Sequence, residues 1–324
     1  MQSEVCKSFA RGDFSSLAEA FTSAGFDAQR PLPGVLQVCA ASSEPRMRLL
    51  ISVGVHGDET APIEIMALLL RELADAISLA PQILAVDLMV VVGNIDAISQ
   101  AKRFIDVDLN RLFSPGRDKF NDAQEATRAD QLMQVAARFF AGHASKWHLD
   151  LHTAIRASTY PAFAIVPGSR NDEFVRWLGL AGIEAAVFNP DASVTFSSYT
   201  CQHLGAVSCT AELGRIGKLG KNDMTQFATT AAALAELMRT GVVGQSTTCP
   251  LLFRVSQELI KRSEAFQLTF DSNTQNFTEF PPRTIIATDG DVNYVVGEVP
   301  EYVLFPNANV RVGLRAGLMV VRAE

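Results

Sequence analysis

The sequence predicts an α/β fold in which helices cover a mixed or mainly parallel β-sheet. Between Val35 and about Gly241, short apolar runs alternate with segments whose apolar residues recur every three or four positions. The runs are typical of buried strands, and the segments are typical of amphipathic helices. Their alternation along the chain is the pattern of a layered α/β domain.

The expected elements follow from this periodicity. Strands are expected at Val35–Ala40, Arg48–Val55, Ala85–Val92, Trp147–Leu151, Ala162–Val166, Glu184–Phe188 and Ala206–Leu213. Helices are expected at Thr60–Leu79, Asp122–Phe140, Asp172–Leu180 and Asp223–Arg239. The polar stretch from Gly93 to about Asn121 has little periodicity, and a loop of this length in a compact domain favours a functional segment.

The chain changes character after Gly244, where the helical periodicity ends. Short β-like runs separated by Pro, Gly and Asn take its place. These runs are Leu251–Val255, Ala265–Phe270, Thr284–Ala287, Val292–Val296 and Gly317–Val321. We therefore predict a large α/β domain over residues 1–243 and a smaller β-rich domain over residues 244–324.

Composition excludes several classes of protein. Hydrophobic residues make up 48% of the 324 residues, which suffices for a large core, yet no apolar stretch is long enough to cross a bilayer as a helix. The segment Met1–Asp13 lacks the features of an export signal, so we expect a cytoplasmic protein. The net charge of −7 and the absence of a Lys/Arg run argue against nucleic acid or an anionic membrane as a partner.

The cysteines do not indicate a disulfide framework. The five are irregularly spaced and include no CxxC pair. Cys201 and Cys209 flank the segment that leads to Glu212, but we interpret them as small buried side chains and not as metal ligands.

A candidate metal site begins in the segment VGVHGDE, which connects an expected strand to an expected helix. His56 and Glu59 are three positions apart, and across such a turn an imidazole and a carboxylate can reach one point. Their nitrogen and oxygen atoms suit zinc. Taken alone, the same spacing would describe a surface histidine beside a first-turn glutamate that the helix dipole favours.

A third ligand follows the expected buried strand Trp147–Leu151, which leads directly into His152. Functional groups collect at the carboxyl ends of strands in open α/β sheets, so His56 and His152 are expected to meet there. Two histidines and one glutamate leave a fourth zinc position open, as in catalytic sites. The remaining histidines lack such companions and are expected to pack or to lie on the surface: His143, His148 and His203.

An acidic residue interrupts an apolar strand in the segment TAELG. A buried carboxylate without a partner is costly, so Glu212 needs a physical reason to be there. The functional interpretation is a group that takes a proton from a water molecule beside the metal and passes it to a leaving amine. The alternative is an ion pair with Arg215 at the end of the strand.

Arg103 opens the segment RFIDVDLNR in the long polar loop. A guanidinium aimed at a carbonyl oxygen stabilises a developing oxyanion, and its forked N–H groups match a carboxylate. The alternative is a loop that is held by ion pairs of Arg103 with Asp106 and Asp108.

The segments VGVHGDETAPIE, RFIDVDLNR, DLHTAIR and TAELG, in this order, resemble the succinylglutamate desuccinylase and aspartoacylase family, relatives of the zinc carboxypeptidases. The similarity spans nearly the whole chain, including a β-rich tail that the peptidases lack. The resemblance implies a carboxypeptidase-like domain that binds one zinc ion. Its implied zinc ligands are His56, Glu59 and His152, with Glu212 as general acid/base.

The resemblance also implies that Arg103 polarises a carbonyl and that Asn110 and Arg111 bind an α-carboxylate. The segments around His56 and His152 and the closing FPNANVRVGLRAGLMV are closer to the desuccinylase branch than to aspartoacylase. The implied reaction is hydrolysis of N2-succinylglutamate to succinate and glutamate, the last step of arginine catabolism by the succinyltransferase route. One departure is the Asp at position 58, where the family pattern leads us to expect Asn, next to the metal ligands.

This substrate carries three carboxylates, so an acidic protein must gather cations in one pocket. Zinc, Arg103, Arg111 and Arg156 are the candidates. Arg156 lies four residues after His152, and we predict that it binds a distal carboxylate. The alternative is a loop arginine that faces solvent.

Three other functions stay open at this point. They are an aspartoacylase-like or other N-acyl-amino-acid amidohydrolase, a peptide carboxypeptidase, and a zinc-binding protein without turnover, which would not need Glu212. The sequence does not set the oligomeric state, and a homo-oligomer is compatible with it.

Overall fold

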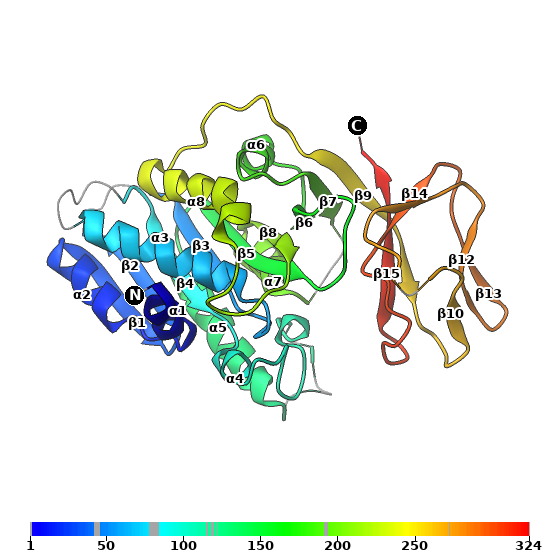
Figure 1. The fold of residues 1–324 in the computed structure, drawn as a ribbon, viewed down its shortest axis with the longest axis horizontal. Helices are drawn as coiled ribbons and strands as arrows, with labels where there is room; N and C mark the ends of the chain where they lie inside the picture. The colour runs from blue at the N-terminus through cyan, green and yellow to red at the C-terminus, as the bar shows by residue number, and fades with distance from the viewer. Residues whose placement is uncertain are drawn as a thin grey trace.

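The computed structural model describes residues 2–41, 46–77, 84–114, 116–117, 120, 122–190, 194–271 and 273–323. Within these residues, twelve strands form one mixed sheet and three strands form a second, smaller sheet. Helices flank the large sheet, and the strands from β9 onward lie at the far end of the molecule from α1 and α2 (Figure 1). The predicted α/β fold class with a β-rich C-terminal part is confirmed.

The larger sheet has the strand order β1-β2-β4-β3-β5-β8-β6-β7-β9-β15-β14-β11, and the smaller one has the order β10-β12-β13. The strands of the larger sheet are β1 (Phe26–Leu32), β2 (Val35–Ala40), β3 (Arg48–Val53), β4 (Asp87–Val92), β5 (Lys146–Ala154), β6 (Phe163–Pro167), β7 (Ala185–Asn189), β8 (Val207–Arg215), β9 (Leu251–Ile260), β11 (Thr278–Phe280), β14 (Glu301–Leu304) and β15 (Arg315–Arg322). The strands of the smaller sheet are β10 (Phe266–Leu268), β12 (Ile285–Asp289) and β13 (Val292–Val295). The α-helices are α1 (Gln2–Ala10), α2 (Ser15–Ser23), α3 (Ala61–Ile77), α4 (Ile95–Ser99), α5 (Gln124–Phe140), α6 (Asp172–Leu180), α7 (Phe196–Leu204) and α8 (Ala228–Thr240). Two short 3₁₀ helices are η2 (Leu109–Arg111) and η4 (Met224–Phe227).

The centre of the large sheet is parallel and buried on both faces. β3 pairs in parallel with β4 and β5, and β5 pairs in parallel with β8. Leu49 and Ile51 of β3 belong to the core that α1, α2, α3, α6 and α8 cover, whereas Leu50 belongs to the core under α5 and α7. Strands that are covered on both sides read as continuous apolar runs, which explains why these strands were predictable.

Several element boundaries differ from the prediction. β5 continues to Ala154, so His152 lies inside the strand and not after it, because the pairing with β8 continues there. β3 ends at Val53, since Gly54 has a φ of +62°. The helix expected to end at Leu79 is described as far as Ile77, and Leu79 itself lies outside the described residues.

The polar loop before α5 is held by a buried carboxylate. Glu125 accepts the backbone N–H groups of Ile105 at 2.6 Å, Asp106 at 3.2 Å and Val107 at 3.3 Å. Asn94 Nδ2 donates to it at 3.2 Å. Hydrogen bonds to a charged acceptor are the stronger ones, so α5 fixes the segment that carries the candidate loop residues.

The C-terminal strands extend the large sheet, since β9 pairs in parallel with β7 and antiparallel with β15. Phe163 of β6 packs with Phe277 at a ring-centroid distance of 5.2 Å, within an apolar cluster that spans both parts of the chain. The predicted domain boundary between residues 243 and 244 lies between α8 and β9 and stays a prediction. Among the described residues, no helix has the length and apolarity needed to cross a membrane.

Candidate active site

A glycine-rich turn carries His56 from the end of β3 to α3. A Cβ on Gly57 would lie 2.4 Å from Ala97 C and 2.4 Å from Ile98 N, so no side chain fits against the backbone of α4. Gly57 N also donates to Arg103 O at 3.0 Å, which ties the turn to the polar loop. The turn is therefore packed on both sides and aims His56 at the sheet edge.

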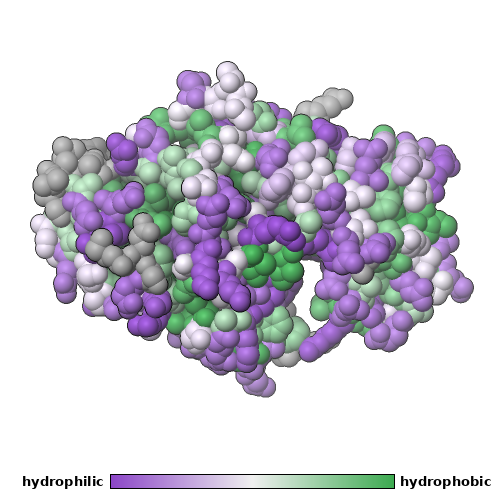
Figure 2. All heavy atoms as spheres, viewed as in Figure 1, coloured by the Kyte–Doolittle hydropathy of each residue, from purple (hydrophilic) through white to green (hydrophobic). Residues whose placement is uncertain are grey.

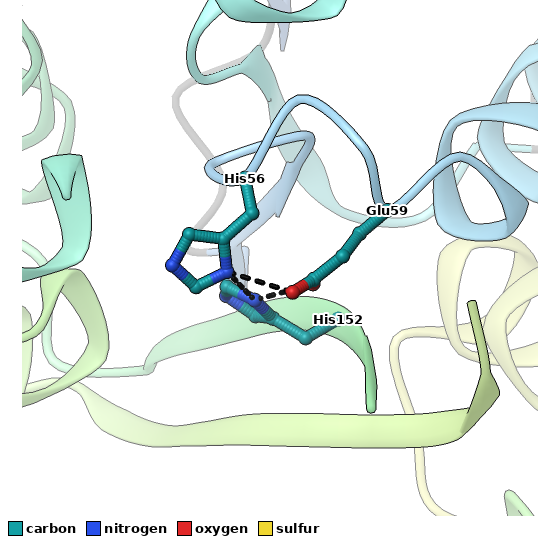
Figure 3. Close-up of side chains that lie close together, drawn as sticks. All are labelled: His56, Glu59 and His152. Carbon is teal, nitrogen blue, oxygen red and sulfur yellow. Dashed lines mark hydrogen bonds and ion pairs between the residues drawn. The ribbon is translucent and has the colours of Figure 1, made fainter. Parts of the chain in front are cut away.

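Three predicted ligands converge in a buried cluster: His56, Glu59 and His152. One ligand atom of each lies within 4.8 Å of the others. His56 Nδ1 is 2.8 Å from Glu59 Oε1, His152 Nδ1 is 2.9 Å from Glu59 Oε2, and the two Nδ1 atoms are 3.2 Å apart. Figure 3 shows the three side chains pointing toward one another from the turn after β3 and from β5.

The other nitrogen of each imidazole faces a carboxylate. His56 Nε2 is 2.9 Å from Asp108 Oδ1, and His152 Nε2 is 3.0 Å from Asp150 Oδ2. A carboxylate accepts but does not donate, so we assign a proton to each Nε2, although Arg103 Nη2 also lies 3.1 Å from that of His56. Both Nδ1 atoms then present lone pairs to the Glu59 carboxylate.

The charges and donor atoms of this cluster suit a divalent metal ion. Two imidazole lone pairs and a carboxylate face one another in a buried site, where they repel unless a positive charge lies between them. Two His and one Glu are a ligand set for zinc, and carboxylates behind ligating imidazoles orient them for the metal. His56, Glu59 and His152 therefore suit a metal ion by both charge and donor chemistry.

The electrostatics of the cluster lead to the same conclusion. Burial disfavours the protonated form of His152, but Asp150 and Glu59 outweigh burial and raise its pKa well above the usual value. The pKa of His56 is raised against burial by Glu59 and Asp108. Burial raises and the two imidazoles lower the pKa of Glu59, and the net change is strongly downward. The Glu59 carboxylate thus stays ionised and requires compensating positive charge, from protons or from a metal.

A buried hydrogen-bonded chain supports Asp150 from behind. Ser52 Oγ donates to Asp150 Oδ1 at 2.5 Å, His148 Nε2 lies 2.8 Å from Ser52 Oγ, and His148 Nδ1 lies 2.7 Å from Thr200 Oγ1. Burial lowers the pKa of His148 to about 4, so this imidazole is neutral. His148 is therefore a polar core residue, while His143 is half-buried and His203 is exposed.

Glu212 lies beside the ligand cluster. It pairs with His152 in the register of β8 and β5 and is buried. Burial and the Glu59 charge raise its pKa to about 7. Its Oε2 has no hydrogen-bond partner among the described residues, and none of their ion pairs joins it to Arg215, the alternative considered above. A carboxyl group that titrates near neutral pH can both accept and return a proton.

The polar loop delivers Arg103 to the cluster, and Asn110 is linked to it through Asp108, whose Oδ1 accepts from Asn110 N at 2.9 Å. Arg103 Nη1 donates to Glu59 Oε1 at 2.7 Å, and none of the ion pairs in the described part of the chain joins Arg103 to Asp106 or Asp108. Asn110 Oδ1 accepts the N–H of Phe196 at 3.0 Å. The exposed Arg111 donates to Asn110 O at 3.0 Å.

A cavity of about 670 Å³ opens beside Glu59, Arg103 and Glu212. Its other walls come from the segment after His152, from Arg215 and from two loops of the C-terminal part, before β11 and after β14. Asn110 and Arg111 are not among its lining residues. Arg156 lines this cavity and donates to Thr274 O at 3.0 Å and to Pro306 O at 2.7 Å. Figure 2 shows the surface hollowed where the helical body meets the C-terminal strands.

The prediction from sequence missed the carboxylates Asp108 and Asp150 as partners of the histidines. Asp150 lies two positions before His152, and in a strand this spacing places both side chains on one face, which was a usable signal. Asp108 offered no comparable signal, because its approach to His56 depends on the course of the loop.

Comparisons with known proteins show the family of the chain. A sequence model described as the succinylglutamate desuccinylase/aspartoacylase catalytic domain matches residues 45–238, and one described as the AstE/AspA barrel-sandwich hybrid domain matches residues 249–323. The chain is 42% identical to a succinylglutamate desuccinylase of Burkholderia lata over 289 residues, covering 87% of this chain and 81% of that protein.

Solved structures of similar proteins show the same fold. A succinylglutamate desuccinylase of Vibrio parahaemolyticus superposes with a TM-score of 0.86 at 29% identity, covering 93% of this chain and 90% of that one. The corresponding structure from Chromobacterium violaceum has a TM-score of 0.80 at 34% identity, covering 95% and 97% of the two chains.

The role of Asp150 can be tested by metal binding. Asp150→Asn removes the charge that favours a proton on His152 Nε2, so the affinity for Zn²⁺ should fall about 10- to 100-fold. Competition with a chromophoric chelator measures this affinity without turnover. Asp291→Asn, at an exposed position, is the matched control and should bind as the wild type does. Equal affinities of the two variants would show that Asp150 does not support the metal ligand.

Proposed function

Since the chain belongs to the succinylglutamate desuccinylase/aspartoacylase family, we propose that it hydrolyses the amide bond of N2-succinylglutamate to succinate and glutamate with one zinc ion. The observation that supports this proposal best is the buried His56, Glu59 and His152 cluster with Glu212 beside it at a cavity wall. A cavity of about 670 Å³ has the size of a small-molecule site.

The three convergent side chains would hold the metal: His56 and His152 through Nδ1 and Glu59 through its carboxylate. Zinc would supply a Lewis acid that polarises a carbonyl oxygen and lowers the pKa of a water molecule. The chain's own contribution is to keep both imidazoles in the Nδ1-accepting form, through Asp108 and Asp150.

Glu212 would move the proton. As water attacks the amide carbonyl carbon, its proton passes to the Glu212 carboxylate, and the same proton then goes to the amine nitrogen as the carbon–nitrogen bond breaks. The raised pKa of about 7 suits both steps. Positive charge from a bound metal would lower this pKa and favour the base form before attack.

The arginines would bind the negative charges of the substrate. Arg103, which lines the cavity, would stabilise the oxyanion that develops on the amide carbonyl. Asn110 and Arg111 would bind the α-carboxylate of the glutamate, which requires the substrate to reach the loop beside the cavity. Arg156 would bind a distal carboxylate from the opposite wall.

The wider context follows the same proposal. We place the reaction at the end of arginine catabolism by the succinyltransferase route, in the cytoplasm, with residues 1–243 as the catalytic domain and residues 244–324 as a β-rich domain. An aspartoacylase-like or other N-acyl-amino-acid amidohydrolase is the second candidate, because the metal cluster and Glu212 would serve any amide of this kind.

A substrate comparison tests the proposal directly. Zinc-loaded protein should release amine fastest from N-succinylglutamate, and more slowly from N-succinylarginine, N-acetylglutamate and N-acetylaspartate. The physical reason is that only the first substrate offers all three carboxylates to the cationic pocket. The measurement is kcat/KM for each compound. A clear preference for N-acetylaspartate would replace the proposed function by the second candidate.

Glu212→Gln tests the proton transfer. The amide keeps the shape but cannot take a proton, so kcat/KM should fall by about 10²- to 10⁴-fold while the metal stays bound. Elemental analysis of the purified variant and steady-state kinetics provide the two readouts. Near-normal turnover would assign Glu212 a structural role.

Arg103 and Arg111 should differ in their kinetic signatures. Arg103→Gln removes a donor to the developing oxyanion and should lower kcat by about 10²- to 10³-fold. Arg111→Gln removes a carboxylate clamp and should raise KM by about 10-fold or more, with a smaller change in kcat. Metal content is checked in both variants, since Arg103 also contacts Glu59. The opposite pattern of kcat and KM would refute the two assignments.

A further inference from the structure

We propose that Arg215 and Asn276, together with Arg156, form a carboxylate-binding subsite in the cavity wall and that this subsite selects substrates with a carboxylate remote from the scissile amide. The inference rests on the proposed function for its substrate and assigns specificity to Asn276, in the C-terminal loop before β11. All three residues line the cavity beside Glu212.

Asn276 is held in place by hydrogen bonds, but its side-chain N–H₂ group is not used in any of them. Its backbone N donates to Ala157 O at 2.9 Å, its backbone O accepts from Thr159 N at 3.0 Å, and its Oδ1 accepts from Phe305 N at 2.8 Å. These bonds fix the orientation of the amide, because only the oxygen can accept from Phe305 N. Asn276 is fully buried, yet its Nδ2 has no hydrogen-bond partner among the described residues.

An unused buried donor is costly, and in a cavity wall it indicates a ligand. The cost disappears when an acceptor enters the cavity, and a carboxylate oxygen is the strongest acceptor that a small metabolite offers. The other hydrogen bonds of Asn276 thus hold its side-chain N–H₂ in place at the cavity wall.

Arg215 supplies charge at the same cavity. It ends β8, three residues after Glu212, and its guanidinium makes no hydrogen bond or ion pair with another side chain in the described part of the chain. Arg103, in contrast, already contacts the Glu59 carboxylate at 2.7 Å. Arg215 is therefore the cavity arginine whose charge is left for a ligand.

Arg156 connects the segment after β5 to the C-terminal loops of the cavity wall. It follows β5 and donates to the carbonyl oxygens of Thr274 and Pro306, which flank Asn276 and Phe305 in the C-terminal part of the chain. These two hydrogen bonds hold the guanidinium at the cavity wall. Two arginines and an amide N–H₂ around one cavity are the donor set of a carboxylate site.

The carboxylate can come from the acyl group or from the amino-acid side chain of the substrate, and the test separates the two. The main variant is Asn276→Asp, which keeps the shape and the acceptor for Phe305 N but replaces the N–H₂ by a second oxygen. The second variant is Arg215→Gln. Asn293→Asp makes the same charge change at an exposed position of β13 and serves as the control.

Each variant is assayed with N-succinylglutamate, N-acetylglutamate and N-succinylglutamine, of which the last two each lack one distal carboxylate. Both site variants should lose at least about 10-fold in kcat/KM on N-succinylglutamate, relative to the control. On the analogue that lacks the bound carboxylate, this loss should shrink to about twofold or less, which identifies the carboxylate. Equal losses on all three compounds, or no loss, would overturn the proposal.

A binding measurement keeps this test independent of turnover. Calorimetric titration of the zinc-loaded wild type with succinate and with glutamate should show binding of the product that carries the recognised carboxylate, and Asn276→Asp should weaken it at least about 10-fold. Failure to hydrolyse N-succinylglutamate would refute the proposed function alone. Unchanged affinity of Asn276→Asp for both products, or a wild type that binds neither, would refute the subsite.

Discussion

The site depends on one carboxylate, that of Glu59. Its two oxygens lie 2.8 Å and 2.9 Å from the Nδ1 atoms of His56 and His152. Arg103 Nη1 and Thr153 N also donate to it, at 2.7 Å and 3.1 Å. Segments from the turn after β3, from β5 and from the polar loop therefore meet at a single buried charge. Without it, two imidazoles and a guanidinium would face one another with nothing to hold them together.

The acceptor-only character of Asp150 sets a direction for the protons behind this centre. Ser52 must donate to Asp150, so the Ser52 oxygen accepts from His148 Nε2. On its other side, Asp150 favours a proton on His152 Nε2 and leaves Nδ1 free for a metal. The polar core of the sheet thus specifies the tautomer of His152, and the hydrogen-bonded residues Ser52, His148 and Asp150 are all fully buried.

The sequence was informative wherever a side chain's role depends on its own strand or turn. The parallel centre of the sheet, His56 and Glu59 in a tight turn, and Glu212 inside an apolar strand could all be predicted, because burial on both faces and strand-end geometry are local patterns. β1, with mostly exposed residues at a sheet edge, and the short β11 and β14 gave no such pattern. The place of Asn276 in the cavity wall could not be predicted from the sequence. It depends on contacts with segments that are distant in the chain, after β5 and after β14.

An acidic protein can bind a polyanion because solvent and salt screen its distant surface carboxylates, whereas the arginines of the cavity wall lie next to the ligand. The net charge of −7 comes from carboxylates that are spread over the whole chain, and in salt water exposed charges beyond about 8 to 10 Å are largely screened. Arg156 and Arg215 lie in the cavity wall itself, so their charges act on a ligand at contact distance, well inside the screening length. The buried Glu59 is paired with the Arg103 guanidinium at 2.7 Å, so its negative charge is partly compensated. The local field that a ligand meets is therefore set by the wall, and the overall charge mainly affects how fast an anion arrives.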